Sequence, residues 1–214
     1  MNKALDTTKW REFRLSEVFN VECSKYHNPA LYNEGNIPYI ARTTFNNGVV
    51  KKIDTRDNLY PANCIVIGAE SARAFYQKES FLTGNKIYRL YLKDNLNILN
   101  ENLALFFCSL INKKGENYTY SNAFVSSKIE QESILLPIDS KGQIDFAFME
   151  NHIKETKEKI TKLLKAYNTL KQKPKDKKAD LLSLSLSLVA ATIFYCLIIL
   201  ALRSKILLRM ALCK

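Results

Sequence analysis

Hydrophobic and polar residues alternate with a strand-like period through the first two thirds of the chain. Short runs rich in isoleucine, valine, tyrosine and threonine are bounded by glycine, asparagine or proline, a pattern typical of β-strands. These runs occupy residues 37–45, 49–53, 64–67, 86–92 and 134–138. The pattern predicts a domain built around a mixed sheet.

Two segments of this domain carry helical signals. The apolar run LALFFCSLI, residues 103–111, follows Asn100 and precedes Lys113, Lys114 and Gly115. Asparagine favours helix starts, and lysine and glycine favour helix ends, so a buried helix is predicted there. The first segment, WREFRLSEVFNV, predicts a short strand leading into one helical turn.

After Asp145, a candidate N-cap, the apolar period becomes that of a long helix. Steps of alternating four and three residues form a heptad seam, as in coiled coils. The predicted pairing residues are Met149, Ile153, Ile160, Leu163, Tyr167 and Leu170, with Thr156 as the polar member. So narrow a stripe predicts cover by another helix, from this chain or a second one. Docking on the sheet domain is the alternative.

The composition changes again after this helix. A lysine-rich linker, residues 173–180, precedes a segment without charged residues, 181–202, and a basic tail, 203–214. The segment is long enough to span a bilayer as a hydrophobic C-terminal helix. The segment is either a true membrane anchor or the translation of a wrong reading frame after the gene was interrupted. Its Leu-Ser repeats favour an interrupted gene. The predicted fold class is α+β, with a sheet domain over 1–144 and a spacer helix over 145–172.

The chain has a formal net charge of +11, which points toward a polyanionic partner. Residues 9–150 nevertheless carry 17 basic and 16 acidic side chains, so any basic surface of the sheet domain must be arranged locally. The N-terminus lacks the apolar stretch of a secretory signal. We therefore expect a cytoplasmic protein, with membrane association only through 181–202.

Catalytic and metal-binding signals are weak. A glycine-rich phosphate loop is absent from the sequence, Asn-Pro-Ala at 28–30 departs from the Asn-Pro-Pro-aromatic motif of DNA methyltransferases, and Asp-Ser-Lys-Gly at 139–142 is typical of a turn. Cys23 and His27 have the spacing of half a zinc site, but His152 is isolated on the long helix. The sequence predicts no catalytic residue, no metal site and no cofactor.

Three polar segments are candidates for DNA binding. In the first, Asn47-Gly48 predicts a hairpin turn, because both residues tolerate positive φ. Asparagine can bind adenine through two hydrogen bonds, and lysine can meet phosphates, although a plain turn is the alternative. The candidates near this turn are Arg42, Thr43, Thr44, Asn46, Asn47, Lys51 and Lys52.

The second segment, residues 68–81, predicts a polar loop with aromatic side chains, and the third, residues 113–128, interleaves basic, aromatic and hydroxyl groups. Contacts with DNA backbone and bases use such groups. For both segments, solvated loops with aromatic residues on the core are the alternative. The candidate residues are Ser71, Arg73, Tyr76, Gln77, Tyr118, Tyr120 and Lys128.

The order of these pieces resembles the target-recognition half of type I restriction–modification specificity (S) subunits and the related S proteins of type IIB systems. It covers about residues 10–170, through WREFRLSEVFNV, IPYIARTTFNNGV, AFYQKESF, LPIDSKGQIDFAFMENHIK and the long helix. The resemblance implies a module that binds duplex DNA without catalysis of its own. It implies as partners a methyltransferase (M) subunit and, in type I systems, an endonuclease (R) subunit.

The chain departs from that family in two places. Full S subunits have two recognition domains and two spacer helices, so binding a bipartite site would require a homodimer or a second S chain. Ala72-Arg73 also stands where relatives often keep a second glycine. The hydrophobic tail has no place in that family, and it supports an alternative function, a membrane-tethered adaptor that binds a protein or acidic lipid.

Overall fold

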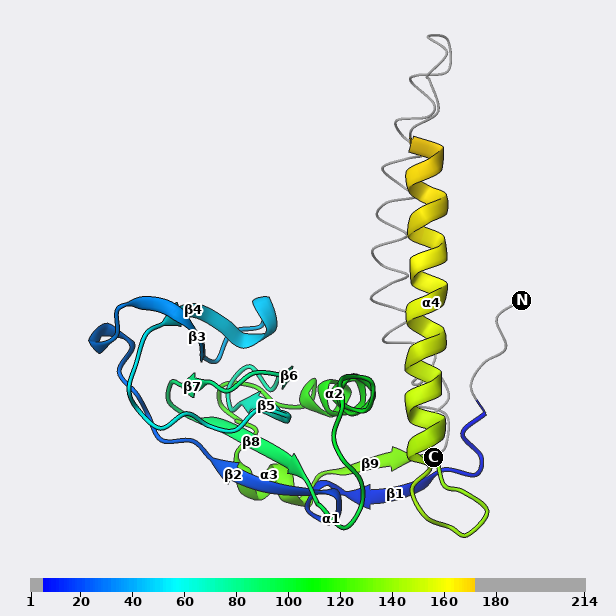
Figure 1. Ribbon diagram of the computed structural model, residues 1–214. Helices are drawn as coiled ribbons and strands as arrows, with labels where there is room; N and C mark the ends of the chain where they lie inside the picture. The colour runs from blue at the N-terminus through cyan, green and yellow to red at the C-terminus, as the bar shows by residue number, and fades with distance from the viewer. Residues whose placement is uncertain (1–5, 172–214) are drawn as a thin grey trace. The chain divides into compact units, whose positions relative to one another are not determined.

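The computed structural model describes residues 6–171 (Figure 1). Its contacts divide the chain into a body, Thr7–Glu150, and a second unit that takes in the long helix from Asn151 onward. The body combines β-sheets with helices, in agreement with the sheet-and-helix content of the predicted α+β class.

The central sheet of the body has four antiparallel strands in the order β2-β8-β5-β6. Every residue of β5 is buried, because this strand lies between two neighbours and beneath helix α2. The strands are β2 (Phe19–Cys23), β5 (Cys64–Gly68), β6 (Ala74–Gln77) and β8 (Ile87–Leu92).

A second sheet has the order β4-β3-β7, with β3 antiparallel to β4 and parallel to β7. Figure 1 shows the β3–β4 hairpin as an arm beside the central sheet. Ile40, the last residue of β3, packs with Val66 and Ile87 of the central sheet, so the two sheets share core. The strands are β3 (Glu34–Ile40), β4 (Val49–Ile53) and β7 (Leu82–Thr83).

The ends of the body meet in a two-stranded sheet, in which β1 (Arg11–Arg14) pairs with β9 (Ser133–Leu136). One helical turn, α1 (Leu15–Val18), follows β1, as the sequence predicted. A short helix, α3 (Ser126–Gln131), precedes β9.

Helix α2 (Glu101–Gly115) contains the predicted apolar run and buries most of it, while Leu105 on its outer face is exposed. The Asn100 side chain caps it, accepting hydrogen bonds from the backbone N–H groups of Asn102 and Leu103 at 3.0 and 3.1 Å. This cap satisfies two of the donors that a helix start leaves without partners.

Helix α4 (Phe146–Lys171) starts where predicted, and Asp145 Oδ1 accepts the backbone N–H of Phe148 at 2.8 Å. The seam residues differ in exposure. Met149 is fully buried and belongs to the body, and Ile153 is also buried, whereas Leu163 is 54% exposed. Pairing of this helix stays a prediction.

Two sequence-based boundaries were wrong. The strand expected over 37–45 ends at Ile40, because the chain leaves the sheet where apolar alternation gives way to Arg-Thr-Thr. Residues 74–77, expected within a polar loop, form β6, which pairs antiparallel with the preceding strand β5 as a hairpin.

Within residues 6–171, no helix has the length and apolar character needed to cross a membrane. The predicted linker (173–180), hydrophobic segment (181–202) and basic tail (203–214) lie outside the described residues.

Candidate nucleic-acid interface

The loop that joins β3 to β4, residues 41–48, bends through three consecutive residues with left-handed backbone. The φ angles of Asn46, Asn47 and Gly48 are 48°, 54° and 82°, a conformation that asparagine and glycine adopt most readily. The backbone N–H of Ala41 donates to the carbonyl of Gly48 at 3.0 Å and closes the loop. The predicted hairpin is confirmed, but its connection is longer than a two-residue turn.

The carboxamides of this loop hold it in place. Asn47 Nδ2 donates to the carbonyl of Tyr76 on β6 at 2.7 Å, and Gln77 Nε2 donates back to the carbonyl of Asn47 at 2.9 Å. Asn46 Nδ2 donates to the carbonyl of Val49 at 2.9 Å. Reading of adenine by Asn46 or Asn47 would therefore require breaking contacts that position the loop.

A further asparagine, which sequence analysis missed, protects the same edge strand. Asn112 of α2 accepts the backbone N–H of Ala74 at 2.7 Å and donates to its carbonyl at 3.2 Å. Together with Asn47 at Tyr76, it covers outward-facing backbone groups of β6, which an edge strand otherwise leaves open to another chain. An asparagine within an apolar helix was the available signal.

Residues 68–73 form a turn that lies against the 41–48 loop. Arg42 forms an ion pair with Glu70, and Lys86 Nζ lies 3.6 Å from the same carboxylate. A Cβ on Gly68 would come within 3.1 Å of the Arg42 Cα, so glycine permits this close approach. The candidates Ser71 and Arg73 are both half-buried in this turn.

The third candidate segment contacts the other side of this turn, where the backbone N–H of Phe124 donates to the carbonyl of Ala69 at 2.8 Å. Tyr118 stacks on Phe124 and donates its hydroxyl to Glu132 at 2.7 Å. Burial and this hydrogen bond raise the pKa of Tyr118 to about 12, so its phenol stays neutral and serves the structure. Tyr120, by contrast, is 81% exposed.

The structure therefore brings most candidates together on three segments joined by the turn: the 41–48 loop, the 68–73 turn and the 116–125 loop. We call these three segments the loop surface. Thr44, Phe45 and Tyr120 are among its exposed side chains. Tyr76 and Gln77 lie beside it on β6, and Lys128 donates from α3 to Asn122.

The two lysines of β4 differ in their surroundings. Lys51 Nζ donates to the carbonyls of Pro29 and Tyr32, so its expected place at the hairpin tip was wrong. Side chains on adjacent strand residues point to opposite faces, and Lys52 is exposed. Only Lys52 of this pair remains available for a phosphate.

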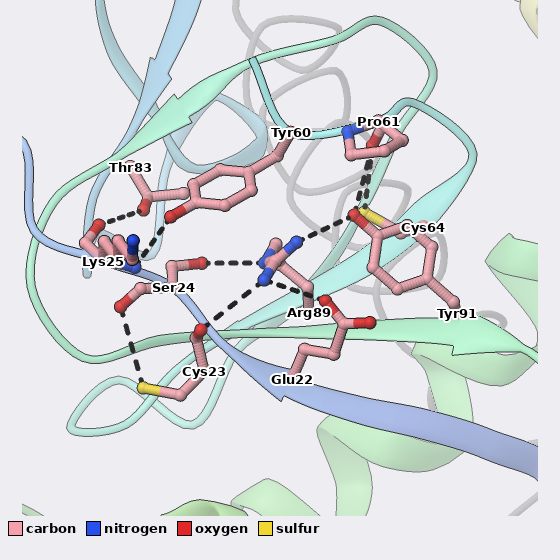
Figure 2. A network of polar contacts seen from close by, with 10 residues as sticks. All are labelled: Glu22, Cys23, Ser24, Lys25, Tyr60, Pro61, Cys64, Thr83, Arg89 and Tyr91. Carbon is pink, nitrogen blue, oxygen red and sulfur yellow. Dashed lines mark hydrogen bonds and ion pairs between the residues drawn. The ribbon is translucent and has the colours of Figure 1, made fainter. Parts of the chain in front are cut away.

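Arg89 on β8 is the centre of a polar network that sequence analysis also missed (Figure 2). It is 7% exposed, and its guanidinium donates to Ser24 Oγ at 3.1 Å and to the Tyr91 hydroxyl at 3.2 Å. It also pairs with Glu22 at 2.9 Å, and its Cζ lies 3.9 Å from the centre of the Tyr60 ring. A buried charge requires such partners.

This network joins β2, β8 and the segment that follows β4. The Tyr60 hydroxyl accepts the backbone N–H of Lys25 at 2.7 Å, which ties that segment to the end of β2. Burial raises the pKa of the nearby Cys64 thiol to about 12, so it remains protonated. The arrangement supports the body rather than chemistry on a substrate.

The described residues contain no group of three or more histidine, cysteine, aspartate or glutamate side chains placed to hold a metal ion. Within that part of the chain, Cys23 and His27 gain no third ligand from the fold.

A family model described as "Type I restriction modification DNA specificity domain" matches residues 7–166. The chain belongs to this family. The match covers the body and most of α4, so the resemblance inferred from the sequence is confirmed. The chain carries a specificity-subunit domain of a restriction–modification system.

Two kinds of relative agree with this assignment. The "Type II restriction enzyme BgcI specificity subunit S.BcgI" of Heyndrickxia coagulans is 25% identical over 160 residues, which are 74% of this chain and 46% of that protein. The HsdS subunit of Thermoanaerobacter tengcongensis is 15% identical, with a TM-score of 0.51, over 76% of this chain and 41% of its own.

A solved structure described as showing the "complex assembly" and "conformational transition of the type I R-M system" is 14% identical to this chain, with a TM-score of 0.56. It covers 94% of this chain, which spans 48% of that one. At this identity the two solved structures show the fold alone. The specificity-domain chain thus spans about half the length of these relatives, and none of the three points to a membrane adaptor.

Proposed function

We propose that this chain is the sequence-specific DNA-binding component of a restriction–modification system and acts on duplex DNA in the cytoplasm. The family match over residues 7–166 carries the proposal. The loop surface supports it, because three segments far apart in sequence converge there and expose polar and aromatic side chains.

In this proposal the loop surface faces the DNA, with the exposed Lys52 on β4 beside it. Arg42 and Lys52 contact phosphates and fix the position of the chain, while exposed loop side chains meet base edges. The near balance of charge in residues 9–150 fits a surface in which a few local cations do this work.

The chain does not itself cut or methylate in this proposal. It directs a methyltransferase subunit and, in a type I system, an endonuclease subunit to the site. Its curated relative is named as a specificity subunit, which supports a division of labour between binding and chemistry.

We further propose that α4 pairs with the same helix of a second copy, or with a second S chain, to bring two recognition domains onto a bipartite site. The half-length match and the exposed apolar residues Leu163 and Leu164 support this pairing. Met149 is buried in the body, so the pairing face starts after it. Sedimentation of the full chain and of Leu163→Glu should show a dimer only for the former.

Selection from a pool of randomised duplexes tests the function. The full chain should enrich one sequence motif, and its binding should weaken as salt is added, because phosphate contacts release counterions. Recovery of unenriched sequence at every round would contradict the proposal.

A further inference from the structure

Phe45 is an exposed aromatic residue in the loop between β3 and β4. Its side chain is 77% exposed, although burying a phenylalanine is worth about 1.5–3 kcal/mol. Its neighbours Thr44 and Asn46 are also exposed, so the ring stands among polar groups. Leu31 and Ile98 are exposed to a similar degree, and Phe45 differs from them because it lies in the loop that carries several of the candidate DNA-binding residues.

The backbone that carries Phe45 is fixed on both sides. Its carbonyl accepts the N–H of Gly48 at 2.9 Å, and its N–H donates to Thr43 Oγ1 at 3.3 Å. The bonds of Asn47 with β6 anchor the loop as a whole. The ring is therefore presented at a defined place, which limits the ordering cost of binding.

The polar groups of the loop limit which parts of DNA the Phe45 ring is left to contact. The carboxamides of Asn46 and Asn47 are engaged within the protein, and Arg42 and Lys52 suit phosphates. Phe45 is the large apolar side chain that this loop exposes, so the contact it can offer is apolar. On the major-groove edges of the bases, the apolar group is the 5-methyl of thymine.

We propose that Phe45 is a specificity-determining residue that packs against a thymine 5-methyl group in the major groove. Its recognition half-site then contains at least one A·T pair. Asn46 and Asn47 act as positioning residues that hold the ring. This inference rests on the proposed DNA-binding function and adds to it one base and one residue.

The experiment replaces single thymines by uracil in the duplex selected by the full chain, which removes the methyl group alone. Wild type should lose about fourfold in affinity at one thymine, since burying a methyl group is worth about 0.8 kcal/mol. Phe45→Ala should bind about tenfold more weakly or worse and should be indifferent to the same replacement. Leu31→Ala, at a side chain that is 78% exposed, is the matched control and should behave as wild type.

Several results would overturn the inference. They are a selected motif without an A·T pair, indifference of wild type to every uracil, and a uracil penalty that Phe45→Ala retains. A rise in 2-aminopurine fluorescence that depends on Phe45 would show instead that the ring enters the base stack. Failure to select any motif would defeat the proposed function itself, so the two failures are distinct.

Discussion

The central strand of the four-stranded sheet and the strands of the β3–β4 hairpin face different surroundings, and their residues differ accordingly. In β5 all five residues are buried, whereas β4 alternates and leaves Val50 and Lys52 exposed. A strand buried on every side has no side chain left for a partner. The comparison indicates that the central sheet supports the fold and that the hairpin and its loop carry the contacts.

The arginines of the two regions show the same difference. Arg89 in the central sheet contacts Ser24, Tyr91, Glu22 and the Tyr60 ring, and almost none of it reaches solvent. Arg42 in the hairpin loop pairs with Glu70 and keeps 32% of its side chain exposed. Substitutions in the two regions should therefore separate loss of stability from loss of binding.

The largest effect is expected at Arg89. Arg89→Ala removes a packed guanidinium and leaves a cavity beside Tyr60, so the free energy of unfolding should fall by about 3–4 kcal/mol. Urea denaturation followed by circular dichroism measures it. Arg56→Ala, at an exposed arginine, is the control and should stay within about 0.5 kcal/mol of wild type. Equal stability of the two variants would contradict the support role of the central network.

The second largest loss of stability is expected for Gly115→Ala. A Cβ there would lie 2.2 Å from the Ala72 carbonyl oxygen, and backbone cannot move aside as a side-chain end can. The cost should be about 2–3 kcal/mol in unfolding free energy. Gly142→Ala is a useful comparison, because its added Cβ meets nothing within 4 Å and only its φ of 74° opposes the change. If Gly142→Ala proved the more damaging, close packing of α2 on the turn would not be the cause.

Asn47 should affect stability and binding together. Asn47→Ala loses the bond to Tyr76 and places alanine in left-handed backbone, for a combined cost of about 2 kcal/mol in unfolding free energy. Asn47→Gly keeps the backbone conformation and should cost about half as much. Both should weaken binding to a selected duplex, because both release the loop. Normal affinity in a destabilised Asn47→Gly would show that loop anchoring does not serve binding.

The smallest effect should separate two adjacent lysines. Lys52→Gln should reduce the slope of log affinity against log salt by about one, as expected for one lost phosphate contact. Lys51→Gln should leave that slope unchanged and lower stability slightly, because Lys51 holds the carbonyls of Pro29 and Tyr32. Fluorescence anisotropy over a salt series measures both slopes. An equal change in the two variants would contradict the assignment of the phosphate contact to Lys52 alone.

The local signals of the sequence predicted much of the fold. Apolar alternation located most strands, and Asn100 and Asp145 marked the starts of α2 and α4. Strand β6 was missed because its run of four residues is short, and the 69–73 connection to β5 contains no glycine, asparagine or proline to mark a hairpin turn. A hairpin without turn residues leaves little local signal in the sequence.

The candidate site was predictable in composition but not in arrangement. The polar segments were identified, yet the bond from Asn47 to Tyr76 links residues 29 positions apart and could not be foreseen. The roles of Lys51 and Arg89 depend on the same kind of distant contact. Phe45 carried a visible signal, an apolar residue between two polar ones at a turn, and was passed over.

The central claim is that this chain distinguishes one DNA sequence from others through the loop surface. Its most direct test is the affinity of the full chain for the selected duplex and for a scrambled duplex of the same composition, measured at one physiological salt concentration. The account predicts a preference of about a thousandfold or more for the selected duplex. Equal affinity for the two duplexes would contradict it.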